Sequence, residues 1–260
     1  MIPWYEYLLL PIIGLAAGFL NVIAGGGGFI QIPALIYIFN LPPQIANATS
    51  RLTVCCVNAT SMTIFHKHDQ LELQYIKRPF IPTIIGAIIG ALTAAVLSPK
   101  AFELLFGLVM IGIAIFLITN PKRLTASNRN VLHKPKLEYL AYFAIGIYCG
   151  FIQAGGAILL LIALSFFRTP HLVKATAAKN MLTFFITLFP TLIFAYFQQI
   201  DYAKGLLLLI GAIPGSFLGV KFSISKGATF IFYIIIIIAL LTGLDLTIST
   251  IIDFLTNHAK

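Results

Sequence analysis

Long hydrophobic runs separated by short polar segments fill most of the 260-residue chain. Segments such as 79–99, 205–220 and 229–244 carry no charged residue. About 20 consecutive apolar residues in a helix cross the hydrocarbon core of a bilayer. The pattern therefore predicts an all-α polytopic membrane protein with eight hydrophobic segments, near residues 5–39, 45–65, 79–98, 101–119, 138–167, 171–197, 203–223 and 228–244.

The order of motifs indicates an internal duplication. GFLNVIAGGGG at 18–28 is followed by ANATSRL at 46–52, and in the second half GFIQAGG at 150–156 is followed by VKATAAKNML at 173–182. IGAIIG and IGAIPG, then SPKAF and SKGATF, continue the series in the same order. Such internal symmetry is typical of transporters built from structural repeats. We predict a first transmembrane repeat at 1–119, a basic cytoplasmic linker at 120–137 and a second transmembrane repeat at 138–260.

The first segment of each repeat is too long for one crossing. Residues 5–39 comprise 35 positions, whereas about 20 suffice. Four consecutive glycines, Gly25 to Gly28, each cost a helix roughly 1 kcal/mol relative to alanine. We therefore expect a break there and, more weakly, at Gly155 and Gly156. The alternative is that these glycines only allow close helix packing, as expected for Gly86 and Gly90 and for the series Gly211, Gly215 and Gly219.

Composition changes the meaning of the positive charge. The chain is 59% hydrophobic and 10% charged, with mean hydropathy +0.97 and net charge +9, which excludes an ordinary soluble domain. Lysine and arginine cluster beside the hydrophobic segments, as topology signals do, so we expect a lipid bilayer and no nucleic acid as partner. No signal-peptide pattern is found at the start, which we expect to be retained.

The positive charges also separate two topologies. Arg51 and Lys179 fall inside segments and are set aside. If all eight segments cross, the remaining cations divide ten against five. If the two glycine-broken segments instead enter and leave on one side, twelve lie on the cytoplasmic side and three outside. The positive-inside rule favours the second arrangement, with inverted repeats and both termini outside.

Arg51 and Lys179 are the most informative residues. Both lie about two turns inside a span, where a charge costs some 2.5–3.5 kcal/mol unless it faces a cavity or a partner. The alternative is that their long side chains reach the interface. Both also follow an Ala-Thr pair at matching positions of the repeats, which favours a shared role in binding an anion together with helix N-termini at the breaks. The candidate substrate-binding residues are Asn21, Gly25, Gly26, Gly27, Gly28, Thr49, Ser50, Arg51, Asn58, Gln153, Gly155, Gly156, Thr176, Lys179 and Asn180.

Other chemistry is not indicated. All eight acidic residues fall near segment ends or in loops, and Cys55, Cys56 and Cys149 have no metal-binding spacing. Neither HExxH nor GxSxG occurs. We expect no enzyme activity, no metal and no cofactor.

These motifs resemble the sulfite exporter TauE/SafE family of membrane permeases. The resemblance rests on GFLNVIAGGGGFIQIPAL at 18–35 and ANATSRL at 46–52, and spans nearly the whole chain. The second glycine motif departs from the family at Gln153 and Ala157, where glycine is common. The resemblance implies a bacterial inner-membrane transporter of about eight helices that exports sulfite, sulfonates or related sulfur-containing organic anions.

The leading hypothesis is therefore a secondary transporter of a small anion that works by alternating access between the two repeats. An anion channel and a membrane assembly or sensor subunit without transport activity remain alternatives. A homodimer is left open.

Overall fold

The computed structural model describes residues 4–119, 132–225, 240–248, 250 and 252. Within these ranges the chain is helical, with short loops and no strand, as the hydropathy pattern predicts. The labelled elements are α1 (Trp4–Ala24), α2 (Gly28–Tyr37), α3 (Pro43–Lys67), the 3₁₀ turn η1 (Leu73–Tyr75), α4 (Lys77–Val96), α5 (Pro99–Thr119), α6 (Pro135–Phe151), α7 (Gly156–Phe167), α8 (Leu172–Tyr196) and α9 (Tyr202–Ser225), and residues 240–248 are also helical.

Both glycine motifs interrupt a helix, as predicted. The first break separates α1 from α2 and the second separates α6 from α7. Gly25 has φ 70° and Gly155 has φ 77°, in the left-handed region that favours glycine. The predicted linker 120–137 is shorter than expected at its end because α6 already begins at Pro135, which suits the first turn of a helix. Residues 120–131 of that linker lie outside the described residues.

Two pairs of helices pack closely and in parallel. α1 lies along α9, where a Cβ at Gly215 would be 2.9 Å from the carbonyl carbon of Leu15. α4 lies along α6, where a Cβ at Gly90 would be 2.8 Å from the amide nitrogen of Phe151. The packing role expected for these glycines is confirmed, since a larger side chain would push the backbones apart.

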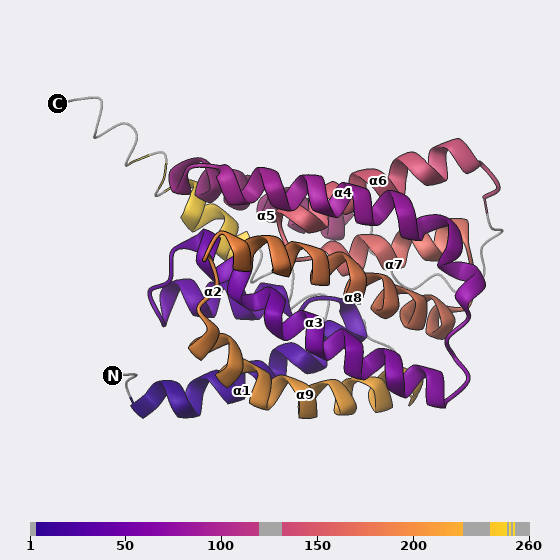
Figure 1. The fold of residues 1–260 in the computed structure, drawn as a ribbon, viewed down its shortest axis with the longest axis horizontal. Helices are drawn as coiled ribbons and strands as arrows, with labels where there is room; N and C mark the ends of the chain where they lie inside the picture. The colour runs from indigo at the N-terminus through magenta and orange to yellow at the C-terminus, as the bar shows by residue number, and fades with distance from the viewer. Residues whose placement is uncertain (1–3, 120–131, 226–239, 249, 251, 253–260) are drawn as a thin grey trace.

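The pairing is reciprocal between the halves. The first helix of each half packs against the fourth helix of the other, and α3 packs against α8. In Figure 1, α1 and α3 begin at the left of the view, whereas α6 and α8 begin at the right. Corresponding helices of the two halves therefore run in opposite directions.

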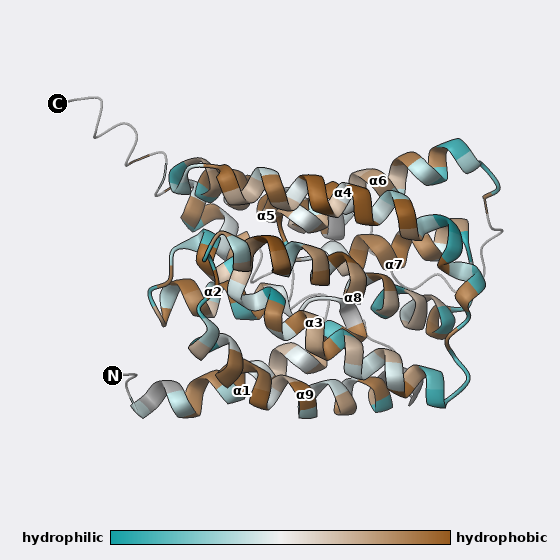
Figure 2. Cartoon of the chain, viewed as in Figure 1, coloured by the Kyte–Doolittle hydropathy of each residue, from teal (hydrophilic) through white to brown (hydrophobic). Residues whose placement is uncertain are grey.

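Polar residues inside the fold are concentrated on α3. Asn47, Ser50, Arg51 and Asn58 are all fully buried, and Figure 2 shows hydrophilic positions along this helix while brown dominates α4 and much of α9. Among the described residues, three helices are long and apolar enough to cross a membrane, namely Lys77–Val96, Leu172–Tyr196 and Tyr202–Phe222. Because other helices surround α3, these four buried residues do not face the lipid.

Candidate functional site

The two helix breaks contact each other. A Cβ at Gly25 would lie 2.5 Å from the Cβ of Ala157, and a Cβ at Gly28 would lie 3.1 Å from the Cα of Ala154. The first break therefore packs on the start of α7, and the start of α2 packs on the second break. Two glycine motifs more than 120 residues apart in sequence form one centre, with α3 and α8 beside it.

Arg51 of α3 caps the C-terminal end of α6. Its guanidinium donates hydrogen bonds to the carbonyl oxygens of Cys149 (3.0 Å) and Gly150 (2.7 Å) and to Oε1 of Gln153 (3.1 Å). The side chain is fully buried, and its guanidinium carbon lies 4.9 Å from the ring centroid of Phe194. Within the described structure it has no carboxylate partner.

Lys179 of α8 makes the equivalent contact on α1. Its ammonium donates to the carbonyl oxygens of Asn21 and Val22, both at 3.1 Å, and the side chain is fully buried. Asn21 and Val22 lie in the last turn of α1, as Cys149 and Gly150 lie in the last turn of α6. Each half therefore provides the cation that caps the broken helix of the other half.

Helix polarity explains why cations bind at these ends. The last carbonyl groups of a helix have no partner within the helix and carry roughly half a negative charge. A buried lysine or arginine that donates to them satisfies both groups. The structure places Arg51 and Lys179 beside the breaks, where their donors meet carbonyl oxygens at the ends of α6 and α1. Their role in binding an anion stays a prediction.

Asn47 fixes the second break and was missed in the sequence. Its amide donates to the carbonyl oxygen of Phe151 and accepts from the amide N–H of Gln153, both at 3.1 Å. The Gln153 side chain also donates to Thr187 at 3.2 Å. Asn47 lies one helical turn before Arg51, so a search along that face of α3 could have found it.

Several predicted residues make hydrogen bonds within their own helices. The hydroxyl of Ser50 donates to Asn47, that of Thr176 donates to Leu172, and the Asn58 amide donates to Val54. Thr49 accepts from the amide N–H of Asp201 at 3.0 Å, ahead of α9. The structure therefore does not bring Thr49, Ser50 and Thr176 to the breaks as donors.

Other buried polar atoms have no hydrogen-bond partner among the described residues. An orphaned buried polar group costs about 1–3 kcal/mol, so each such atom is a candidate partner for water or a ligand. Neither the amide nitrogen nor the amide oxygen of Asn180 has a hydrogen-bond partner. Thr53 and Thr183 also belong to this set, and the sequence analysis did not predict them as site residues. The atoms on α1, α3 and α8 are Asn21 Nδ2, Arg51 Nε, Thr53 Oγ1, Asn58 Oδ1, Asn180 Nδ2, Asn180 Oδ1 and Thr183 Oγ1.

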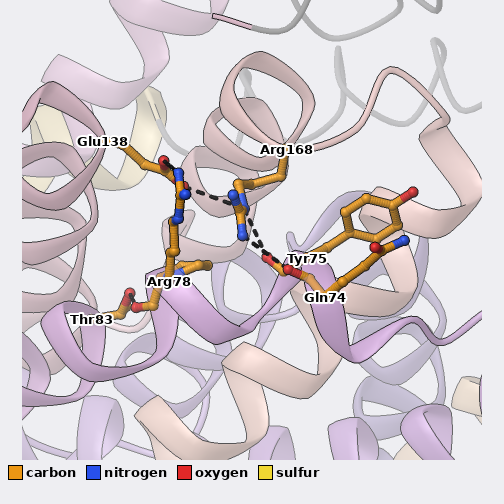
Figure 3. A network of polar contacts seen from close by, with 7 residues as sticks. Gln74, Tyr75, Arg78, Thr83, Glu138 and Arg168 are labelled. Carbon is orange, nitrogen blue, oxygen red and sulfur yellow. Dashed lines mark hydrogen bonds and ion pairs between the residues drawn. The ribbon is translucent and has the colours of Figure 1, made fainter. Parts of the chain in front are cut away.

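A second polar network lies at the end of the molecule where α6 and α8 begin. Glu138 of α6 is 3.3 Å from Nε of Arg168 and 3.8 Å from the guanidinium of Arg78. Arg168 also donates to the carbonyl oxygen of Gln74 at 2.9 Å (Figure 3). Lys174 pairs with Glu72, and this contact lowers the pKa of the Glu72 carboxyl. The network joins the α3–α4 connection to α6, α7 and α8 and does not reach the breaks.

Both charged side chains at the centre are cations. Arg51 and Lys179 are buried there, beside the positive ends of the α2 and α7 dipoles and the negative ends of the α1 and α6 dipoles. Among the described residues, Glu138 is the only acidic side chain in the buried set, and it belongs to the peripheral network. The described residues also hold no group of three or more His, Cys, Asp or Glu side chains suited to a metal ion.

Fold and centre together define a polytopic α-helical membrane protein whose broken helices meet between two halves. The profile of the Sulfite exporter TauE/SafE family matches residues 10–246. The chain belongs to this family, which is a family of membrane transporters.

Relatives agree with this assignment along most of their length. The chain is 27% identical over 236 residues to a probable membrane transporter protein of Haemophilus influenzae, covering 89% of this chain and 90% of the relative. It is 25% identical over 231 residues to the probable membrane transporter protein YfcA of Escherichia coli K12, with 89% and 86% covered. The probable membrane transporter protein YunE of Bacillus subtilis is 22% identical over 242 residues, with 83% and 86% covered. No solved structure matches the chain.

Proposed function

We propose that this chain is a secondary transporter of a small anion in the bacterial inner membrane. The substrate is sulfite, a sulfonate or another sulfur-containing organic anion, and it binds where the two helix breaks meet. The family description names sulfite. The observation that carries the proposal is the reciprocal capping of α6 by Arg51 and of α1 by Lys179.

A charge count at the centre supports an anionic substrate. Each helix end contributes roughly half an elementary charge, negative at the ends of α1 and α6 and positive at the starts of α2 and α7. These four helix ends cancel approximately, so the two full positive charges of Arg51 and Lys179 remain. An anion would neutralise this excess, whereas a cation would add to it.

The orphaned polar atoms suit an oxyanion. Arg51 Nε, Asn21 Nδ2, Asn180 Nδ2 and the Thr183 hydroxyl can each donate to an oxygen of a sulfite or sulfonate group. Hydrogen bonds from a charged donor to an oxyanion are roughly twice as strong as neutral ones. Selection between an oxyanion and a halide would then depend on several donors acting together.

Alternating access follows from the relation between the halves. Because corresponding helices run in opposite directions (Figure 1), the same packing can be adopted with the roles of the halves exchanged, which opens the centre to the opposite side. Each cation would remain attached to the broken helix of the other half, and the substrate would bind between them.

Transport in proteoliposomes tests the proposal. Arg51→Ala and Lys179→Ala should each lower the initial rate of uptake of sulfite or of a sulfonate by about tenfold or more, since a lost charged hydrogen bond costs about 1.5–3 kcal/mol. Arg51→Lys should retain part of the rate. Lys221 is an exposed cation of α9. Lys221→Gln should leave the initial rate of uptake unchanged and serves as the control for a lost positive charge.

A ligand screen accompanies the transport assay. Sulfite, thiosulfate, sulfate, sulfoacetate and taurine are tested for an increase in melting temperature, with cations and neutral solutes as controls. The proposal is wrong if no anion is bound or transported. It is also wrong if both alanine variants transport at the wild-type rate while gel filtration shows that they are folded. A flux that does not saturate with concentration would indicate a channel instead.

A further inference from the structure

A groove opens on the outer surface between the first turns of α4 and α6. It has a volume of about 490 Å³, and its lining includes Lys77, Arg78, Ile81 and Ile85 from α4 and Leu140 and Phe143 from α6. Exposed fractions are 64% for Ile81, 63% for Leu140 and 48% for Ile85. We call these six residues the α4–α6 groove.

Polar and apolar residues are separated along the groove. Lys77 and Arg78 occupy the first turn of α4, and Ile81 and Ile85 follow one and two turns later. At 1.5 Å per residue, Ile85 lies about 12 Å deeper along the helix than Lys77. Tyr139, which is 47% exposed, lies at the polar end, where tyrosine is favoured at a membrane surface.

The protein neutralises the two cations only in part. Arg78 is 3.8 Å from Glu138, its side chain is 55% exposed, and Glu138 is nearer to Arg168, at 3.3 Å (Figure 3). Lys77 is exposed and has no carboxylate partner among the described residues. The polar end of the groove therefore presents positive charge toward the lipid headgroups.

We infer that the α4–α6 groove binds an anionic phospholipid, with its phosphate at Lys77 and Arg78 and its acyl chains along Ile81, Ile85, Leu140 and Phe143. Charge and shape both support this occupant, because basic pockets between transmembrane helices bind anionic headgroups. A free anion would gain nothing from the apolar part of the groove. A zwitterionic lipid would gain little from the two cations. The inference depends on the membrane location of the chain and not on the proposed substrate.

Lipid titration of the purified, delipidated protein tests this site. Phosphatidylglycerol and phosphatidylcholine with the same acyl chains are each added while the melting temperature is followed, which gives an apparent affinity for each lipid. Phosphatidylglycerol should bind more tightly to the wild type. Lys77→Gln should weaken phosphatidylglycerol binding about fivefold, the effect of one interfacial cation, and leave phosphatidylcholine unchanged.

Two further variants separate headgroup from acyl-chain contacts. Ile81→Trp fills the groove and keeps both cations, so it should weaken phosphatidylglycerol binding even though the charge is unchanged. Lys100→Gln removes an exposed lysine from the first turn of α5, outside the groove, and should have no effect. Native mass spectrometry should show phosphatidylglycerol retained by the wild type and depleted in Lys77→Gln.

Three results would overturn the inference. The wild type could bind both lipids equally, Lys100→Gln could weaken phosphatidylglycerol binding as much as Lys77→Gln, or inorganic phosphate could raise the melting temperature as much as phosphatidylglycerol. The last result would indicate a site for a soluble anion. Each variant should elute from gel filtration at the wild-type volume, which confirms that a lost response to lipid reflects the groove and not misfolding.

Discussion

At the residue scale, the geometry of the breaks depends on two glycines with positive φ. Gly25 and Gly155 hold the backbone in a conformation that costs other residues roughly 1–2 kcal/mol. Gly25 is also pressed against α7, so a side chain there would meet Ala157. Strain and crowding therefore coincide where the two halves touch.

Gly25→Ala should destabilise the protein and lower its melting temperature, because the positive φ and the overlap with Ala157 both oppose a Cβ. Each effect is worth about 1–3 kcal/mol. Gly112→Ala is the matched control, since Gly112 lies within α5 and a Cβ there meets nothing within 4 Å. The control should be neutral or stabilising by about 0.5–1 kcal/mol. Equal melting temperatures for the two variants would contradict the observed contact.

The sequence predicted Arg51 and Lys179 as site residues because a charge inside a membrane span is costly wherever its partner lies. It did not identify their partners, which are carbonyl oxygens in the other half of the chain. Asn47 was missed for the same reason, since its contacts depend on packing between α3 and the second break. Thr49 and Thr176 were included as polar residues close to Arg51 and Lys179 in the sequence, yet the Thr49 hydroxyl accepts from the amide N–H of Asp201 and the Thr176 hydroxyl donates within its own helix.

At the element scale, hydropathy predicted the helices well because each span must be both long and apolar. Glycine runs placed the two breaks correctly for a local reason, the low helix propensity of glycine. α3 was also predicted, as segment 45–65, although it is the least apolar of these long helices. Its many buried polar residues keep it outside the set of clearly apolar spans, and only the surrounding helices make its place inside the protein clear.

The ion pair between Glu72 and Lys174 joins the α3–α4 connection to the start of α8. The hydrogen bond from Lys174 lowers the pKa of the Glu72 carboxyl. A carboxyl with a lowered folded-state pKa stabilises the fold above the unfolded-state pKa of about 4.3 and loses that effect as pH falls through its folded value. The wild type should therefore melt at a slightly higher temperature than Glu72→Gln at pH 7, and this difference should shrink and then disappear as pH falls from the unfolded-state pKa through the lowered folded-state pKa.

Asp69→Asn is the control for this pH dependence. Asp69 is exposed in the same connection and has no ion pair among the described residues. The difference in melting temperature between Asp69→Asn and the wild type should therefore not change with pH. A pH-independent difference for Glu72→Gln would show that the ion pair does not contribute to stability.

At the scale of the whole molecule, the connections divide between two ends. The α3–α4 and α7–α8 connections lie at the right of Figure 1, while the α4–α5 and α8–α9 connections lie at the left. The preferred charge count in the sequence puts Lys67, Lys77, Arg78 and Arg168 together on the cytoplasmic side. The structure gathers the connections that carry these cations at one end, which supports that count. Sequence alone could not decide it, because charge in a few short loops is a weak signal compared with the direction of each helix.

Labelling of single cysteines distinguishes the two topologies. Cys55, Cys56 and Cys149 are first replaced, and a cysteine is placed at exposed Asp69 in the α3–α4 connection or at exposed Gln198 in the α8–α9 connection. If the glycine-broken segments return to the side they entered, these positions lie on opposite faces of the membrane. A membrane-impermeant thiol reagent should then label Gln198→Cys in intact cells, and Asp69→Cys only after permeabilisation. If all eight segments crossed, both positions would lie on one side and would label together, and the inverted arrangement on which alternating access depends would be wrong.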